Sequence, residues 1–251
     1  MGRLDGKVIV VTGGGRGFGR AYSLGLAREG ATVAIAEMNQ EDAKGTQAAV
    51  EELGGRAMIY ETDVRDEASV LAMRDAVDRD LGGIDGLINN AGVMPPMDLK
   101  DITKEFWDRI YDTNVWGSFL TARTVSHSMR QRGGGSIVNI ASSTFFNPSP
   151  GSATYISSKG AVVALTRALA TGLAPHGIRV NSIYPGLTAT PGVLEGRPIS
   201  DEYFESRVAK QMVKRRSQID DVVGAAIFLL SEESAFMTGQ GIPVNGGIGM
   251  V

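Results

Sequence analysis

Tyr155 and Lys159 are the residues whose types and spacing point most directly to chemistry. They stand four residues apart in the segment Ala153–Lys159 (ATYISSK), so a helix would place them one turn apart on the same face. A phenol with an ordinary pKa of about 10 is a poor base at neutral pH. An ammonium ~4 Å away, at an effective dielectric constant of about 20, favours the phenolate by about 4 kcal/mol before desolvation. We therefore expect Lys159 to lower the pKa of Tyr155 by about two pH units or more, so that the pair can exchange a proton with an alcohol or a carbonyl oxygen.

An ordinary helix can also contain an aromatic residue and a solvated lysine, so the interpretation of this pair depends on other residues. Ser142 ends the apolar run Ser136–Ser142, 13 residues before Tyr155, and its hydroxyl could hydrogen-bond the oxygen of a substrate. Asn114 falls early in a long segment with a helical pattern. The tetrapeptide Asn89-Asn90-Ala91-Gly92 ends another apolar run. A phenol, an ammonium, a hydroxyl and an amide are thus available for one proton-transfer site.

A glycine-rich loop follows the first apolar run of the chain. Residues 12–19 read TGGGRGFG, with the spacing T-G-x-x-x-G-x-G. Gly13 permits a tight turn, Gly17 lets the backbone approach a pyrophosphate, and Gly19 lets the following helix pack on a sheet. The amino end of that helix offers free N–H groups and the positive end of the helix dipole. The alternative is a glycine-rich turn without a ligand, but a strand before and a helix after favour a dinucleotide site.

Two residues disagree on which dinucleotide this loop would bind. Glu37 ends the second apolar run, 20 residues after Gly17, where a carboxylate accepts hydrogen bonds from a ribose and repels the 2′-phosphate of NADP. Arg16, inside the loop, could instead bind that phosphate. We give Glu37 more weight, because Arg16 can turn toward solvent or the adenine face. The sequence therefore predicts NAD as the cofactor, with NADP the less favoured alternative.

Alternating strands and helices must position these residues. Short runs rich in Val and Ile predict strands at 7–12, 31–37, 57–63, 86–90, 136–142, 178–185 and 241–245, and longer patterns predict helices at 17–29, 40–53, 67–81, 104–132, 154–173 and 218–230. Strands that are apolar on both faces belong in a parallel sheet with helices on both sides. We predict one α/β domain over 1–251, a Rossmann-type doubly wound parallel sheet of about seven strands. Residues 186–216 fit no strand and are predicted to form a substrate lid within it.

Composition narrows the classes of function. The chain has 251 residues, a net charge of −3, no Cys and only two His, so thiol chemistry and disulfides are excluded, and we expect no metal site. No basic balance points to nucleic acid. No apolar run approaches the ~20 residues of a membrane span, and the amino end carries no secretory signal pattern. We expect a cytoplasmic protein that binds neither nucleic acid nor membrane.

Taken together, six features in order resemble the short-chain dehydrogenase/reductase family along essentially the whole chain. They are TGxxxGxG at 12–19, NNAG at 89–92, Asn114, Ser142, YxxxK at 155–159, and Pro185-Gly186 followed by Thr190. The resemblance implies that Tyr155 donates or accepts the proton, that Lys159 binds the nicotinamide ribose, that Ser142 orients the substrate carbonyl, and that Asn114 holds a water that relays protons to Lys159. It further implies a homotetramer, with the carboxyl-terminal segment at an interface.

The resemblance also assigns the cofactor contacts. Asp63 and Val64 would contact adenine, Asn90 would lie against the adenosine side, and Thr188 and Thr190 would bind the nicotinamide carboxamide. The loop residues Gly13, Arg16, Gly17, Phe18 and Gly19 complete the set, with Glu37, Tyr155 and Lys159. The chain departs from the family pattern in having Glu37 where Asp is more common, Asn245 for a usual Asp, and Phe18 for Ile or Leu. Ser143 offers a second hydroxyl beside Ser142, but the 13-residue spacing makes Ser142 the match.

The substrate is indicated only by the apolar residues that should surround the reacting carbon. We expect the pocket to be formed by Met94, Phe145, Phe146, Tyr184 and Leu187, which favours a cyclic or aromatic alcohol over a sugar or an acid. Residues 140–146 locally resemble family members that oxidise pyridoxal or aryl alcohols such as 1-phenylethanol. Two alternatives stay open. One is a 3-oxoacyl-(acyl-carrier-protein) reductase that uses NADPH and a basic patch (Arg197, Arg207, Lys210, Lys214, Arg215 and Arg216). The other is a catalytically silent NAD-binding or interaction protein.

Overall fold

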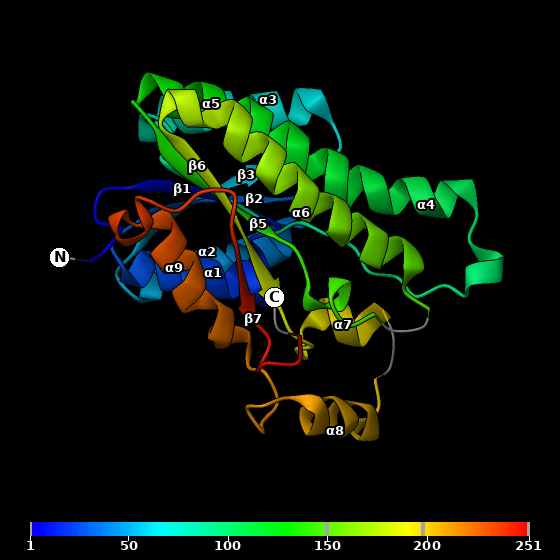
Figure 1. Ribbon diagram of the computed structural model, residues 1–251. Coiled ribbons are helices and arrows are strands. Elements are labelled where there is room, and N and C mark those ends of the chain that lie inside the picture. The colour runs from blue at the N-terminus through cyan, green and yellow to red at the C-terminus, as the bar shows by residue number, and fades with distance from the viewer. Residues whose placement is uncertain (1, 149–150, 197–198, 250–251) are drawn as a thin grey trace.

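One seven-stranded parallel sheet forms the centre of the molecule (Figure 1). The computed structural model describes residues 2–148, 151–196 and 199–249. Spatial order in the sheet is β3-β2-β1-β4-β5-β6-β7. The strands are β1 (Val8–Thr12), β2 (Thr32–Glu37), β3 (Arg56–Glu61), β4 (Gly86–Asn89), β5 (Gly135–Ile140), β6 (Ile178–Pro185) and β7 (Gly241–Val244). The predicted doubly wound α/β fold is confirmed, and the strand order reverses between β1 and β4, where such sheets open a crevice for a ligand.

Helices cover both faces of this sheet (Figure 1). One face carries α1 (Gly17–Arg28), α2 (Gln40–Glu52) and α9 (Val223–Leu230), and the other carries α3 (Glu67–Leu81), α4 (Lys104–Tyr111), α5 (Gly117–Gln131) and α6 (Ala153–Leu173). The side chains of β1 alternate between the two layers: Ile9 and Val11 join the core with α1 and α9, while Val8 and Val10 join the core with α3 and α5. Both faces of the strand are therefore buried, as its apolar sequence requires.

The predicted helix over residues 104–132 is divided by a π-helical turn. Residues Asp112–Trp116 form this turn between α4 and α5. A π turn adds one residue to the helical repeat and so changes which residues face the sheet. It places Asn114 inward, fully buried. The sequence pattern did not predict the turn, because hydrophobic periodicity does not register a single added residue.

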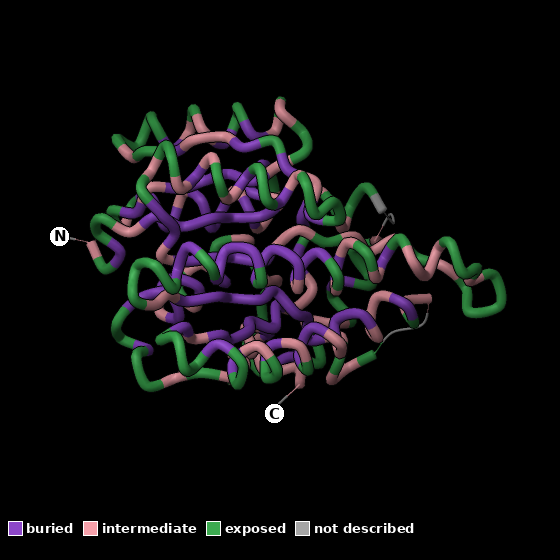
Figure 2. Tube along the Cα trace, turned by 90° about the horizontal axis from the view of Figure 1, so that it is seen from above, coloured by how far each residue is buried: buried purple, intermediate pink, exposed green. Residues whose placement is uncertain are grey.

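Residues 186–216, the predicted lid, contain two further helices on the side of the carboxyl ends of the strands. These are α7 (Pro191–Gly196) and α8 (Asp201–Lys210). A bridge between Thr188 and Ser217 joins the two ends of the insertion, and their hydroxyl oxygens lie 2.9 Å apart. Figure 2 shows buried residues through the middle of the molecule and an exposed loop, which precedes α4, projecting at one end. Within the described residues, no helix is both long and apolar enough to cross a membrane.

Candidate active site

Helix α6 carries the predicted acid–base pair on the face that it turns toward the sheet. Lys159 is 5% exposed, and its Nζ donates to the carbonyl oxygen of Ile140, 2.6 Å away at the end of β5. The same Nζ lies 5.8 Å from the centroid of the Tyr155 ring. Tyr155 is half-buried. The end of β5 therefore fixes the ammonium beneath the phenol, and the two groups lie close together as their spacing predicted.

Burial dominates the proton affinities of this pair. It raises the pKa of Tyr155, although hydrogen bonding to Ser142 opposes the rise, and it lowers the pKa of Lys159 to about 8. The expected direction for Tyr155 was therefore wrong for the protein without a bound nucleotide. The Lys159 ammonium is itself desolvated and donates a hydrogen bond to Ile140. The free energy needed to remove a phenolate from water therefore exceeds the stabilisation that this cation provides.

The two adjacent serines after β5 have different partners. Ser142, 7% exposed, accepts hydrogen bonds from the backbone N–H and the hydroxyl of Thr144, at 3.2 and 2.8 Å. Since it is the acceptor in both, its own proton stays available for the phenol or for a substrate oxygen. Ser143 donates its proton to the carbonyl oxygen of Pro185, 2.8 Å away. The structure thus separates a serine that faces the site from one that ties β5 to β6.

Asn114 uses its whole side chain to join three segments. Its Oδ1 accepts from the N–H of Val93 at 2.8 Å, and its Nδ2 donates to the carbonyl of Val93 and to the hydroxyl of Ser158, both at 3.0 Å. These bonds connect the π turn to the loop after β4 and to α6. They place Asn114 close to Lys159, because its partner Ser158 immediately precedes that lysine. The expected water relay through Asn114 stays a prediction.

The glycine loop has the backbone that a dinucleotide site needs. Gly13 and Gly17 have φ values of 61° and 54°, which L side chains rarely adopt. A Cβ on Gly19 would lie 1.9 Å from the carbonyl oxygen of Gly13, so only glycine lets α1 approach the loop. Arg16, the N-cap of α1, makes no side-chain capping bond, which leaves N–H groups of the helix end for an anion. These residues fit a nicotinamide dinucleotide, which supplies a hydride acceptor or donor when bound.

The remaining predicted nucleotide contacts have roles of their own within the protein. Asn90 donates from Nδ2 to the carbonyls of Thr12 and Gly13, both at 3.0 Å, and so fastens the glycine loop to β4. Asp63 pairs with Arg65 at 2.6 Å, which lowers the pKa of the carboxyl. The phosphate loop and the adenine edge are therefore held in place before any ligand binds. Phe18 is partly buried against the core that contains α1, and Val64 is buried in contact with Gly117.

Glu37 and Arg16 lie at the same edge of the loop but have opposite partners. The carboxylate of Glu37 accepts from the N–H of Gly15 at 3.1 Å and from those of Met38 and Asn39 at 2.9 and 3.0 Å. It is thereby folded against the glycine loop, at the end of β2. Arg16 pairs instead with Glu195 of the lid, 2.8 Å away. Sequence reasoning did not single out Glu195, because no spacing rule relates two residues 179 positions apart.

The lid threonines are buried where the lid meets this loop. Thr188 is 3% exposed and Thr190 is 8% exposed. The side chain of Thr190 lies 3.6 Å from the position that a Cβ on Gly17 would take. A group bound at the amino end of α1 would therefore also touch the first residues of the lid, as the prediction for these threonines requires.

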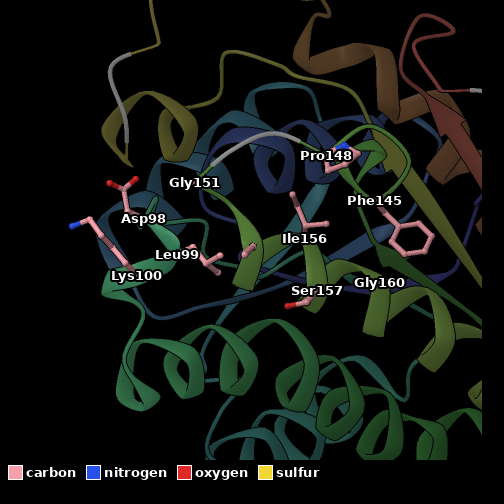
Figure 3. Close-up of a pocket in the computed structure, with 10 residues that line it drawn as sticks. Asp98, Leu99, Lys100, Phe145, Pro148, Gly151, Ile156, Ser157 and Gly160 are labelled. Atoms are coloured by element: carbon pink, nitrogen blue, oxygen red, sulfur yellow. The ribbon is translucent and has the colours of Figure 1, made fainter.

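A cavity lined by the other face of α6 is drawn in Figure 3. It has a volume of about 1080 Å³. At 100° per residue along a helix, Ala153, Ser157 and Gly160 lie opposite Tyr155 and Lys159, and Ile156 lies at the side of the helix between the two faces. The cavity is lined by Asp98, Leu99, Lys100, Phe145, Pro148, Gly151, Ala153, Ile156, Ser157 and Gly160. Its size therefore does not mark it as the place of the chemistry.

The predicted substrate residues are spread over three places. Phe145 lines the outer cavity and packs edge-on against Phe146, with ring centroids 5.0 Å apart. Phe146 in turn packs on Tyr184 at 5.2 Å, and Tyr184 is buried in that cluster. Leu187 lies beneath α8, next to Phe204. Met94 is half-buried in the loop after β4. The structure thus brings Phe145, Phe146 and Tyr184 together as one aromatic stack.

Comparison with known proteins agrees with this geometry. A family model described as enoyl-(acyl carrier protein) reductase matches residues 13–249. Cyclopentanol dehydrogenase from Comamonas sp. is 39% identical over 249 residues, 98% of each chain. Gluconate 5-dehydrogenase from Gluconobacter oxydans is 39% identical over 98% of this chain and 95% of its own. The crystal structure of an NAD⁺-bound xylitol dehydrogenase superposes with a TM-score of 0.91 at 36% identity, covering 97% of this chain and 99% of its own.

The chain belongs to the short-chain dehydrogenase/reductase family. It is an NAD(P)-dependent oxidoreductase that acts on the CH–OH group of its substrate. In this dehydrogenase the face of α6 that carries Tyr155 and Lys159, the free hydroxyl proton of Ser142 and the glycine loop converge at the carboxyl ends of the central strands. That convergence brings together a phenol, an ammonium, a hydroxyl that can donate a hydrogen bond and a glycine loop that fits a nucleotide.

Proposed function

We propose that this enzyme interconverts a secondary alcohol and a ketone by hydride transfer, prefers NAD, and takes an apolar cyclic or aromatic substrate. The observation that carries the proposal is the position of the Glu37 carboxylate, which lies against the glycine loop with hydrogen bonds to three backbone N–H groups. A carboxylate held there can accept a bond from a ribose hydroxyl and repels a 2′-phosphate.

Different residues of the site transfer the proton and bind the substrate oxygen. Tyr155 takes the alcohol proton during oxidation and returns it during reduction, while Ser142 donates a hydrogen bond to the substrate oxygen. Lys159 stabilises the phenolate once Tyr155 has lost its proton, and Ile140 keeps the ammonium in place. Asn114 positions α6 through Ser158. The glycine loop would hold a nicotinamide dinucleotide, which would supply a hydride acceptor for oxidation of the alcohol and a hydride donor for the reverse reaction.

The aromatic stack supports an apolar substrate. Phe146 and Tyr184 adjoin the strand ends that carry Ser142 and Ser143, and we infer that a substrate bound at Ser142 meets apolar surface on that side. Such rings cover a cycloalkyl or an aryl group better than a polyol, whose hydroxyls need hydrogen-bond partners. Among the relatives, the cyclopentanol dehydrogenase is named for a cycloalkyl alcohol, whereas the gluconate and xylitol dehydrogenases are named for polyhydroxylated substrates.

A reductase for acyl carrier proteins is the second candidate, because the matching family model carries such a description. Its acidic partner would need the exposed basic patch of the lid. Two members of that patch are neutralised within the lid region: Arg215 pairs with Asp221 at 2.6 Å, and Arg216 pairs with Asp201 at 2.8 Å and with Glu205 at 2.7 Å. Arg197 lies outside the described residues. These ion pairs favour an apolar alcohol as the substrate over an acyl carrier protein.

A substrate screen with both cofactors tests the proposal. Purified enzyme is mixed with NAD⁺ or NADP⁺ and with cyclopentanol, 1-phenylethanol, xylitol or gluconate, and the absorbance of reduced cofactor is followed. We expect turnover with NAD⁺ and the first two alcohols. Turnover of a 3-oxoacyl thioester with NADPH alone would support the second candidate. Tight nucleotide binding with no turnover of any alcohol or ketone would support a silent nucleotide-binding protein.

We also propose that the enzyme is a homo-oligomer, a tetramer by the family resemblance. The sequence of α6 has only two charged residues, Lys159 and Arg167, in 21 positions, and a helix with so little charge is more typical of one that is covered on both sides. Leu99, 78% exposed, stands beside the apolar cavity on that outer face. A second copy of the chain would cover both. Light scattering on the eluting protein gives the mass, and a monomer at micromolar concentration would contradict the proposal.

A further inference from the structure

The guanidinium of Arg16 is held by the lid. Its Nη1 lies 2.9 and 2.8 Å from the two carboxylate oxygens of Glu195 in α7. Its Nε lies 3.8 Å from Oδ2 of Asp42, near the start of α2. Arg16 is the only cationic residue within the glycine loop at 12–19. The cation that could recognise a 2′-phosphate is thus already shared by two carboxylates.

The position of these carboxylates makes them relevant to the adenosine ribose. Glu37 accepts a hydrogen bond from Gly15, the residue before Arg16. A Cβ on Gly15 would lie 2.8 Å from Cβ of Asp42, so the loop also touches α2 at this point. Three acidic side chains therefore surround a loop that contains one guanidinium. Because two of these carboxylates pair with Arg16, the guanidinium has little positive charge left to offer a phosphate dianion.

Glu195 differs from the other two acids because it belongs to the lid. The lid already touches the loop, since Thr190 and Pro191 each have an atom 3.6 Å from the position of a Cβ on Gly17. The Arg16–Glu195 pair adds a second contact between the loop and the lid, which joins Arg16 to the last turn of α7. Holding Arg16 against α7 directs its charge toward the lid. The same arginine, released, could turn back toward Glu37 and the 2′ position.

We propose that Glu195 is a specificity-determining residue for the cofactor: by pairing with Arg16 it withdraws that guanidinium from the adenosine ribose, so that the site accepts a 2′-hydroxyl and rejects a 2′-phosphate. This inference rests on the proposed NAD preference and deepens it, because it assigns part of the selectivity to a residue of the substrate lid. Cofactor choice then depends on two acids from distant parts of the chain, Glu37 at the end of β2 and Glu195 in α7.

Two nucleotides that differ only in the 2′-phosphate test this inference on the full chain without catalysis. Isothermal titration calorimetry gives the Kd of 5′-AMP and of adenosine 2′,5′-bisphosphate for the wild type, Glu195→Gln and Arg16→Ala/Glu195→Gln. We expect Glu195→Gln to tighten bisphosphate binding by roughly threefold to fivefold, the upper part of the range that an exposed ion pair allows, and to leave AMP binding within about twofold. The double variant should show no gain, because the released arginine is absent.

The controls separate this inference from the proposed function. Glu202→Gln removes a negative charge from an exposed position of α8 and should leave both Kd values unchanged. The ratio of the two Kd values in the wild type tests the NAD preference, whereas its change in Glu195→Gln tests Glu195. The same ratio in Glu195→Gln and the wild type would overturn the inference. So would a gain that survives removal of Arg16, or an equal effect on both nucleotides, which would show that Glu195 only fastens the lid. A gain that shrinks at high salt would support it.

Discussion

The two faces of α6 differ in what they offer to a ligand. The inner face carries Tyr155 and Lys159, with a buried ammonium bonded to Ile140, and it meets Ser142. The outer face carries Ala153, Ser157 and Gly160, which together with Ile156 line a cavity of about 1080 Å³. The outer face therefore offers space for a ligand, whereas the inner face offers groups that could move a proton.

This difference shows that converging polar groups locate an active site better than volume does. On the outer face, Ser157 donates its hydroxyl to the carbonyl of Thr154 in its own helix, so it presents no free group to the cavity. On the inner face, Ser142 keeps its proton free. An enzyme needs groups placed to stabilise a transition state, whereas an apolar cavity on a helix supplies only buried area, which suits a second copy of the chain.

Replacement of Lys159 should have a large effect on kcat if the inner face of α6 is the catalytic one. Lys159→Met should lower kcat for alcohol oxidation by about 10²- to 10³-fold, because the phenolate formed during the reaction loses its neighbouring cation. Steady-state absorbance of reduced cofactor measures the change. A loss of less than tenfold, in a variant whose circular dichroism matches the wild type, would mean that the inner face does not use this ammonium.

Adjacent serines provide a matched pair for the second prediction. Ser142→Ala should lower kcat by about tenfold to a hundredfold, because a hydrogen bond to the reacting oxygen is lost. Ser143→Ala should instead lower the midpoint of thermal unfolding, because Pro185 loses its donor, and keep kcat within about threefold. The two kcat values are compared at saturating cofactor. The reverse order of the two effects would assign the substrate hydroxyl to Ser143.

Stability against pH tests the burial of the inner face. A lysine in the unfolded chain keeps its proton up to a pKa of 10.5, but Lys159 in the folded protein loses it near a pKa of about 8. Between these values the unfolded chain binds more protons, so the free energy of unfolding rises with pH, and below pH 8 the full penalty of roughly 3 kcal/mol is present. Any stability advantage of Lys159→Met should therefore be larger at pH 7 than at pH 10.

Urea denaturation of both proteins at these two pH values measures that change. Other ionisable groups titrate alike in the two proteins, and the neutral lysine still donates to Ile140 at pH 10, so neither affects the difference. An advantage that does not vary with pH would show that the ammonium of Lys159 is solvated, contrary to its 5% exposure.

Sequence patterns predicted the frame of the molecule well because it depends on local rules. Apolar runs placed six of the seven strands to within two residues at each end and β6 at its observed bounds, since strands buried on both faces must be apolar throughout. The tight turn predicted at Gly13 is present, because a positive φ value there favours glycine. Tyr155 and Lys159 lie together because helical spacing brings them together, and their family was predicted from the order of motifs.

What the sequence did not predict depends on distant contacts. The π turn at Asp112–Trp116 and the pairing of Arg16 with Glu195 involve segments that only the folded chain brings together. The raised pKa of Tyr155 depends on how far the phenol and the ammonium are desolvated, which spacing along a helix does not specify. The outer cavity arises where the loop before α4 meets α6.

Turnover in Tyr155→Phe tests the central claim most directly, with Ser157→Ala on the outer face as its matched control. Rates of NAD⁺ reduction with cyclopentanol are measured for both variants and the wild type, together with the Kd of NADH from its fluorescence. We predict that Tyr155→Phe loses about 10²- to 10⁴-fold in kcat, as expected for an acid–base group, and binds NADH as the wild type does. Ser157→Ala should stay within about twofold. Near-normal turnover in Tyr155→Phe would remove the inner face of α6 from the mechanism.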